Sequence, residues 1–84
     1  MNSIDIGHGV QIAPMIGEDA KCGFIWKHPG CRCWFPVWLD ERSTGHALAE
    51  GSLTDLSTIT ITGSLLCPKG CGAHGCIEHG RWKP

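Results

Sequence analysis

Two clusters of cysteine and histidine constrain this 84-residue chain more than any other feature. The first is "HPGCRCW" at residues 28–34, and the second is "CPKGCGAHGC" at residues 67–76. A chain this short buries only a modest apolar core, so domains of this size often add a metal ion or disulfides to it. The stretch from Cys33 to Cys67 is long enough for a loop and a strand to return. The two clusters can therefore supply ligands to one shared site.

Thiolate and imidazole in a tetrahedral shell are the ligands typical of zinc. We predict one structural zinc ion held by Cys31, Cys33, Cys71 and His74. The two-residue spacing between Cys71 and His74 is common in zinc knuckles, whereas the spacing from Cys67 to Cys71 is looser. Cys67 is the alternate ligand, and in that arrangement His74 lies beside the site.

The first cluster also contains His28, three residues before Cys31, which is not among the predicted ligands. One alternative to a metal site stays open. The six cysteines could instead pair as three disulfides. The remaining cysteines, Cys22 and Cys76, lie in apolar surroundings and are expected to pack as small hydrophobic side chains.

The residue pattern predicts a small all-β or β-rich single domain, zinc-ribbon-like, spanning residues 1–84. Twelve glycines favour turns and strands over long helices. Residues 1–20 are predicted to form an N-terminal arm or strand pair, and residues 21–84 a zinc-stabilised β core. We expect two strands within 21–39 joined at "HPGC", and a polar loop with at most one short helix over 40–52.

The later part of the chain carries the clearest strand signal, "LSTITITGSLL" at 56–66. Ile59 and Ile61 are expected to face the core, with the alternating threonines on the other side. A final short strand over 75–77 is predicted to turn near His79, so that Trp82 folds back.

The net charge and the lack of a targeting pattern limit the partners and the cellular compartment that we expect. Seven basic and eight acidic side chains give a formal net charge of -1, which provides no general attraction to phosphate backbones or anionic membranes. The first residues show no signal-peptide pattern, and no apolar run approaches a membrane span. We therefore expect a cytoplasmic protein with reduced thiols and no membrane partner.

The carboxyl third resembles a family of small, mostly uncharacterised zinc-binding proteins of phages and prophages. The matching motif is "GSLLCP" at 63–68, then Cys71, Gly72, His74, Gly75 and Ile77, then Gly80 and Trp82. The close cysteine pair before Trp34 also fits this family. The resemblance implies a small metal-stabilised β domain of phage origin in the host cytoplasm, and it implies no established activity.

Three classes of function are compatible with a small zinc-stabilised β domain. The favoured one is a non-enzymatic module that binds a host or phage protein, as an inhibitor of a host process or defence for example. Its predicted partner-binding residues are Arg81, Trp82 and Lys83, because we expect Trp82 to be the most exposed tryptophan. The alternative is a zinc-ribbon nucleic-acid-binding protein, since an aromatic ring between two cations can stack on a base.

An enzyme is the third class, and we do not favour it. A catalytic zinc keeps an open coordination position beside a general base. Glu78 beside His79 is the pair that comes nearest to this chemistry, yet no nucleophile, base and orienting group can be assembled from the sequence. We therefore predict no catalytic residues.

Overall fold

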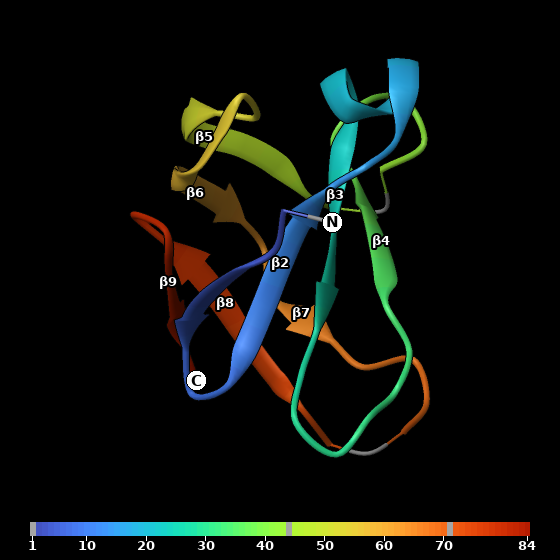
Figure 1. Cartoon of the computed structure of the whole chain (residues 1–84), viewed down its shortest axis with the longest axis vertical. Helices are drawn as coiled ribbons and strands as arrows, with labels where there is room; N and C mark the ends of the chain where they lie inside the picture. Colours follow the sequence, from blue (N-terminus) through green and yellow to red (C-terminus); the bar gives the residue numbers. More distant parts are fainter. Residues whose placement is uncertain (1, 44, 71) are drawn as a thin grey trace.

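The computed structural model describes residues 2–43, 45–70 and 72–84. Within these ranges the chain forms nine strands and one short 3-10 helix, and no α-helix (Figure 1). The elements are β1 (Ile4–Gly7), β2 (Val10–Pro14), η1 (Gly17–Lys21), β3 (Gly23–Lys27), β4 (Phe35–Trp38), β5 (Ala47–Ser52), β6 (Asp55–Thr62), β7 (Leu65–Leu66), β8 (His74–Glu78) and β9 (Arg81–Lys83). The predicted all-β fold is thus confirmed.

The strands form three antiparallel sheets. Strands β1 to β4 are neighbours in chain order in a four-stranded sheet, β5 pairs with β6, and β7, β8 and β9 form the third sheet. Strands β6 and β8 contact each other, and β1 contacts both β6 and β9, so the three sheets close around one interior. Figure 1 shows β6, β7 and β8 running obliquely to β2, β3 and β4.

Tight hairpins connect the strands at both ends of the chain. The β1–β2 turn is made by His8 and Gly9, and the β8–β9 turn by His79 and Gly80. All four residues have positive φ, between 51° and 73°. Two consecutive positive φ values define the type I′ turn, whose twist matches that of paired strands. The strand pair predicted near the N-terminus and the turn predicted near His79 are both present.

The prediction of a loop over 40–52 was wrong for residues 47–52, whereas the described residues 40–43 and 45–46 do lie outside strands and helices. Instead of a loop with a short helix, Ala47–Ser52 forms β5 and pairs with β6. Leu48 is half-buried while most of β5 is exposed, so the sequence of the strand shows little apolar alternation. Pairing with the strongly patterned β6 provides the backbone partners that the local sequence does not indicate.

The interior is lined by side chains from all three sheets. In β6, Ile59 and Ile61 are 0% and 4% exposed, whereas Thr58 and Thr62 are exposed, as predicted. The core cluster comprises Ile6, Val10, Ile12, Phe24, Trp26, Phe35, Val37, Leu56, Ile59, Ile61, Leu65, Cys67, Ile77 and Trp82. Residues of β1 and β2 contribute to it, so the N-terminal segment is a strand pair within the fold rather than an extended arm.

The expectation that Trp82 is exposed was wrong. Trp82 is only 7% exposed, and its ring stacks on Trp26 with centroids 5.4 Å apart. Because β9 returns antiparallel to β8, the side chain of Trp82 faces the interior while Arg81 and Lys83 on either side are exposed. Of the other tryptophans, Trp34 and Trp38 are half-buried.

The helix in the part of the chain that the structure describes is η1, with five residues. No helix there is long and apolar enough to cross a membrane.

Candidate metal centre

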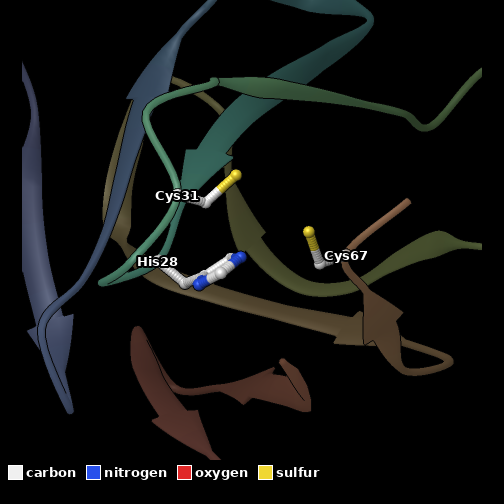
Figure 2. A group of neighbouring side chains, drawn as sticks. All are labelled: His28, Cys31 and Cys67. Carbon is white, nitrogen blue, oxygen red and sulfur yellow. The ribbon is translucent and has the colours of Figure 1, made fainter. Parts of the chain in front are cut away.

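Three side chains from the two sequence clusters meet in space. The ligand atoms of His28, Cys31 and Cys67 all lie within 4.8 Å of one another. Figure 2 shows the two sulfur atoms and the imidazole ring directed toward a common point between the segment after β3 and the segment after β7. Two ligands of one tetrahedral zinc ion lie about 3.3–3.8 Å apart, given Zn–N and Zn–S bonds of about 2.0 and 2.3 Å. A modest contraction would therefore bring the three atoms into one coordination shell.

The first turn explains how His28 and Cys31 come together. The backbone N–H of Cys31 donates to the carbonyl oxygen of His28 at 3.4 Å, closing the turn His28-Pro29-Gly30-Cys31. Pro29 occupies the second position of the turn and Gly30 the third, where φ is +86°. Proline followed by a residue with positive φ is the signature of a type II turn. The turn places its first and fourth residues close together, and both are candidate ligands.

A second turn presents Cys67. The backbone N–H of Gly70 donates to the carbonyl oxygen of Cys67 at 3.2 Å, and Pro68 follows the cysteine as Pro29 follows His28. The N–H of Cys67 also donates to the carbonyl oxygen of Ala73 at 3.0 Å, which fixes the cysteine to the start of β8. The backbone around Cys67 is thus held on both sides.

The tautomer of His28 follows from its hydrogen bond. Nδ1 of His28 lies 2.7 Å from the carbonyl oxygen of Pro29. A carbonyl oxygen can only accept, so Nδ1 carries the proton and donates it. In the neutral ring the lone pair is then on Nε2, and this is the arrangement that metal-bound histidines usually show. His28 is accordingly set up to bind a metal through Nε2.

The hydrophobic core shields one side of this group of three side chains from solvent. His28 and Cys67 are 6% and 2% exposed, and Cys31 is half-buried. The ring of Trp26 lies 5.7 Å from the ring of His28, and the same tryptophan stacks on Trp82. Cys67 belongs to the core cluster itself. The candidate metal centre is therefore continuous with the hydrophobic core.

The electrostatics of the group favour positive charge. The side-chain hydrogen bond with Cys67 raises the pKa of His28, and the Pro29 carbonyl adds to this effect, although burial acts in the opposite direction. The sulfur and the carbonyl thus stabilise a cation at this point. This shift concerns protonation of the ring, and a metal ion would bind the neutral ring in competition with the proton.

Packing also supports the first turn from outside. A Cβ atom at Gly9 would lie 2.6 Å from Cγ of Pro29, so the β1–β2 turn rests directly against the turn that carries His28. Gly9 has a φ of +73°, which a side chain would strain as well. The close approach of these two turns therefore depends on glycine.

The sequence-predicted ligands have different positions. Cys31 belongs to the converging group, and so does Cys67, which the sequence named as the alternate ligand. Cys33 and His74 are exposed, and neither is part of this group. Cys71 lies outside the described residues. The complete ligand set therefore stays a prediction.

Sequence reasoning did not choose His28, which the structure adds to the group. The signal was available in the dipeptide Pro29-Gly30, because a type II turn brings the residue before the proline next to the residue after the glycine. Knuckle-like spacing between cysteines drew attention to Cys33 instead. That spacing says nothing about which side chains point inward.

The other described cysteines lie apart from the group. All five cysteines that the structure describes are free thiols: Cys22, Cys31, Cys33, Cys67 and Cys76. Burial raises the pKa of the Cys22 thiol, and the neighbouring Asp40 carboxylate raises it further. A thiol with a raised pKa is a poor nucleophile and a poor ligand at neutral pH. Cys22 is half-buried and lies outside the core cluster and the side chains packed on it, so its predicted packing role stays a prediction.

Comparison with known proteins gave no match among family models, curated proteins or solved structures. The resemblance of the carboxyl third to phage proteins therefore stays a prediction, and the interpretation of function depends on the residues and their geometry.

Proposed function

We propose that this chain is a non-enzymatic binding module whose β fold is stabilised by one structural zinc ion, and that it acts by binding another protein. The observation that carries the proposal is the convergence of His28, Cys31 and Cys67 at the edge of the core. In a chain of 84 residues, a metal at this point ties the β3–β4 connection to the segment before β8.

Zinc is the metal that this donor set favours. Two sulfur atoms and one imidazole nitrogen are soft and borderline ligands, which suit Zn²⁺ rather than Mg²⁺ or Ca²⁺. A structural zinc site needs a fourth ligand. Cys33, Cys71 and His74 are the remaining ligands predicted from the sequence, and we propose that one of them completes the site.

A structural role is favoured over a catalytic one. Catalytic zinc sites keep an open position and a nearby general base. His28 and Cys67 are buried against the core, which leaves little room for a substrate at that side. Glu78 and His79 lie at the β8–β9 turn, at the opposite end of β8 from the segment that follows Cys67. They are therefore poorly placed to act as a base for this metal.

A protein partner is favoured over a nucleic acid. The alternative depended on Trp82 as an exposed ring between two cations, but this ring is packed on Trp26. The formal net charge of -1 also provides little attraction to phosphate. We propose a host or phage protein as the partner, met in the host cytoplasm, on the basis of the resemblance at the carboxyl end.

Two measurements on untagged, zinc-loaded protein test the proposal. Fluorescence anisotropy with single-stranded and double-stranded oligonucleotides, from low to physiological salt, should show no salt-dependent binding. Crosslinking in host lysate should capture a partner only while zinc is bound, so a chelator-treated sample serves as the control. Tight, salt-dependent oligonucleotide binding would instead support the nucleic-acid alternative.

A further inference from the structure

The outer face of the four-stranded sheet carries an apolar row. Ile25 and Pro36 are register partners on β3 and β4, and Trp38 is two residues beyond Pro36. Their neighbours Phe24 and Val37 point into the core, so these three side chains point away from it. Pro36 is exposed, and Ile25 and Trp38 are half-buried. The face is therefore apolar but incompletely covered.

The chain that leaves β2 extends this row into a groove. Pro14, Met15 and Ile16 line it together with Ile25, Pro36 and Trp38. The groove has a volume of about 580 Å³. Ile16 is 92% exposed, the most of any large apolar side chain among the described residues. An apolar groove of this size beside an exposed isoleucine is typical of a binding site for a side chain of a partner.

The groove is bordered by negative charge. Asp19 lines it, and Arg42 connects Asp19 at 3.7 Å with Asp40 at 2.6 Å. The guanidinium of Arg42 also covers the Trp38 ring at 3.6 Å. The two segments joined in this way, η1 and the turn at 40–42, hold four carboxylates against two cations: Glu18, Asp19, Asp40, Glu41, Lys21 and Arg42. Arg42 offsets one of the two charges of Asp19 and Asp40, and the six side chains sum to a formal charge of -4 + 2 = -2, so the two segments form an acidic border where Asp19 lines the groove.

We propose that this groove binds an extended segment of the protein partner that carries an apolar side chain and, within a few residues of it, a lysine or arginine. The apolar side chain lies between Ile16 and Trp38, and the basic side chain lies beside the carboxylates of η1. This assignment depends on the protein-binding function proposed above and adds the position and chemistry of the contact. An acidic border repels phosphate, so neither a nucleic acid nor an anionic membrane fits this surface.

The test uses a random dodecapeptide display library selected on the full zinc-loaded chain. The chain offers a matched pair of variants, because Ile16 and Leu66 are its two exposed large apolar residues in the described ranges, at 92% and 63%. Enriched peptides are synthesised and titrated into the parent protein, Ile16→Ser and Leu66→Ser. Neither substitution removes a core side chain, so both variants should keep the parent circular dichroism spectrum and zinc content.

The expected peptides contain an apolar residue near a lysine or arginine. Their affinity should be at least about tenfold lower for Ile16→Ser, the scale of an anchor residue, and within about twofold of the parent for Leu66→Ser. Peptides that bind Ile16→Ser and the parent equally would overturn the groove assignment, while a protein-binding function would stand. Acidic enriched peptides, or no enrichment at all, would also overturn it.

Two further outcomes show whether the groove assignment fails alone or together with the proposed protein-binding function. Concentration-dependent self-association in sedimentation, lost in Ile16→Ser, would assign the groove to a second copy of this chain and overturn the peptide assignment. Oligonucleotide binding without any peptide binding would overturn both the groove assignment and the proposed function.

Discussion

The carbonyl oxygen of Pro29 lies 2.7 Å from Nδ1 of His28, and this contact decides which nitrogen of the ring can bind a metal. Because the carbonyl accepts the Nδ1 proton, Nε2 keeps its lone pair. The residue that shapes the ligand turn thus also orients the ligand.

Replacing His28 with alanine should weaken zinc binding by about 100-fold or more, because four ligands share a binding free energy of roughly 10–16 kcal/mol. His74→Ala is the matched variant, since His74 is exposed and is not part of the converging group. Competition with a chromophoric chelator measures both affinities. Unchanged affinity in His28→Ala with a large loss in His74→Ala would favour the ligand set predicted from sequence.

Cys67→Ser and Cys76→Ser should differ sharply in stability. Cys67 belongs to the candidate metal centre and to the core, so its loss should release zinc and unfold most of the chain at ambient temperature. Cys76 is half-buried and lies outside the group, and its loss should cost about 1–3 kcal/mol. Thermal unfolding followed by circular dichroism compares them. Equal melting temperatures would show that Cys67 has no metal-binding role.

Trp82→Ala should destabilise the fold by about 3–5 kcal/mol, the usual cost of truncating a buried aromatic side chain. Trp82 is 7% exposed and stacks on Trp26, which in turn packs beside His28. Lys83→Ala, one residue away and exposed, should change stability by less than about 0.5 kcal/mol. Urea unfolding measures both values. A small effect of Trp82→Ala would indicate that the ring is available to a partner, as the sequence had suggested.

Asp40→Asn should change the pH dependence of stability. Arg42 holds the pKa of Asp40 well below its usual range, through hydrogen bonds to the carboxylate. Because the pKa of Asp40 is lower in the folded state, its interaction with Arg42 stabilises the fold at pH values above the unfolded-state pKa of about 3.9. This stabilisation is lost as the pH falls from that value through the folded-state pKa. The difference in unfolding free energy between parent and Asp40→Asn should be constant near neutral pH and shrink in acid. A difference that grows on acidification would contradict this assignment.

A strand could be predicted from the sequence where its alternation of apolar and polar residues matches the burial of its side chains in the fold. Ile59 and Ile61 alternate with threonines and form the strand they indicate. The glycine turns beside His8 and His79 mark two hairpins. β5 could not be predicted, because its residues are small and exposed and the strand depends on β6 for its hydrogen bonds.

The candidate metal centre could be predicted only in part, because its ligands come together through contacts between distant parts of the sequence. Spacing identified both clusters and included Cys31 and Cys67 among the candidates, but it could not show which side chains point inward. His28 faces Cys67 because a turn reverses the chain at Pro29 and because the core packs behind it. The β8–β9 turn was predicted, but the burial of Trp82 depends on its stacking on Trp26, which lies far away in the sequence.

The zinc content of the folded chain tests the structural-zinc hypothesis most directly. Untagged protein is purified under reducing conditions, and its metal is measured by elemental analysis while circular dichroism follows the β signal during titration with a strong chelator. We predict one zinc ion per chain, and loss of the β signal in step with zinc release. A zinc-free chain that keeps the same β signal and melting temperature would contradict a structural metal at His28, Cys31 and Cys67.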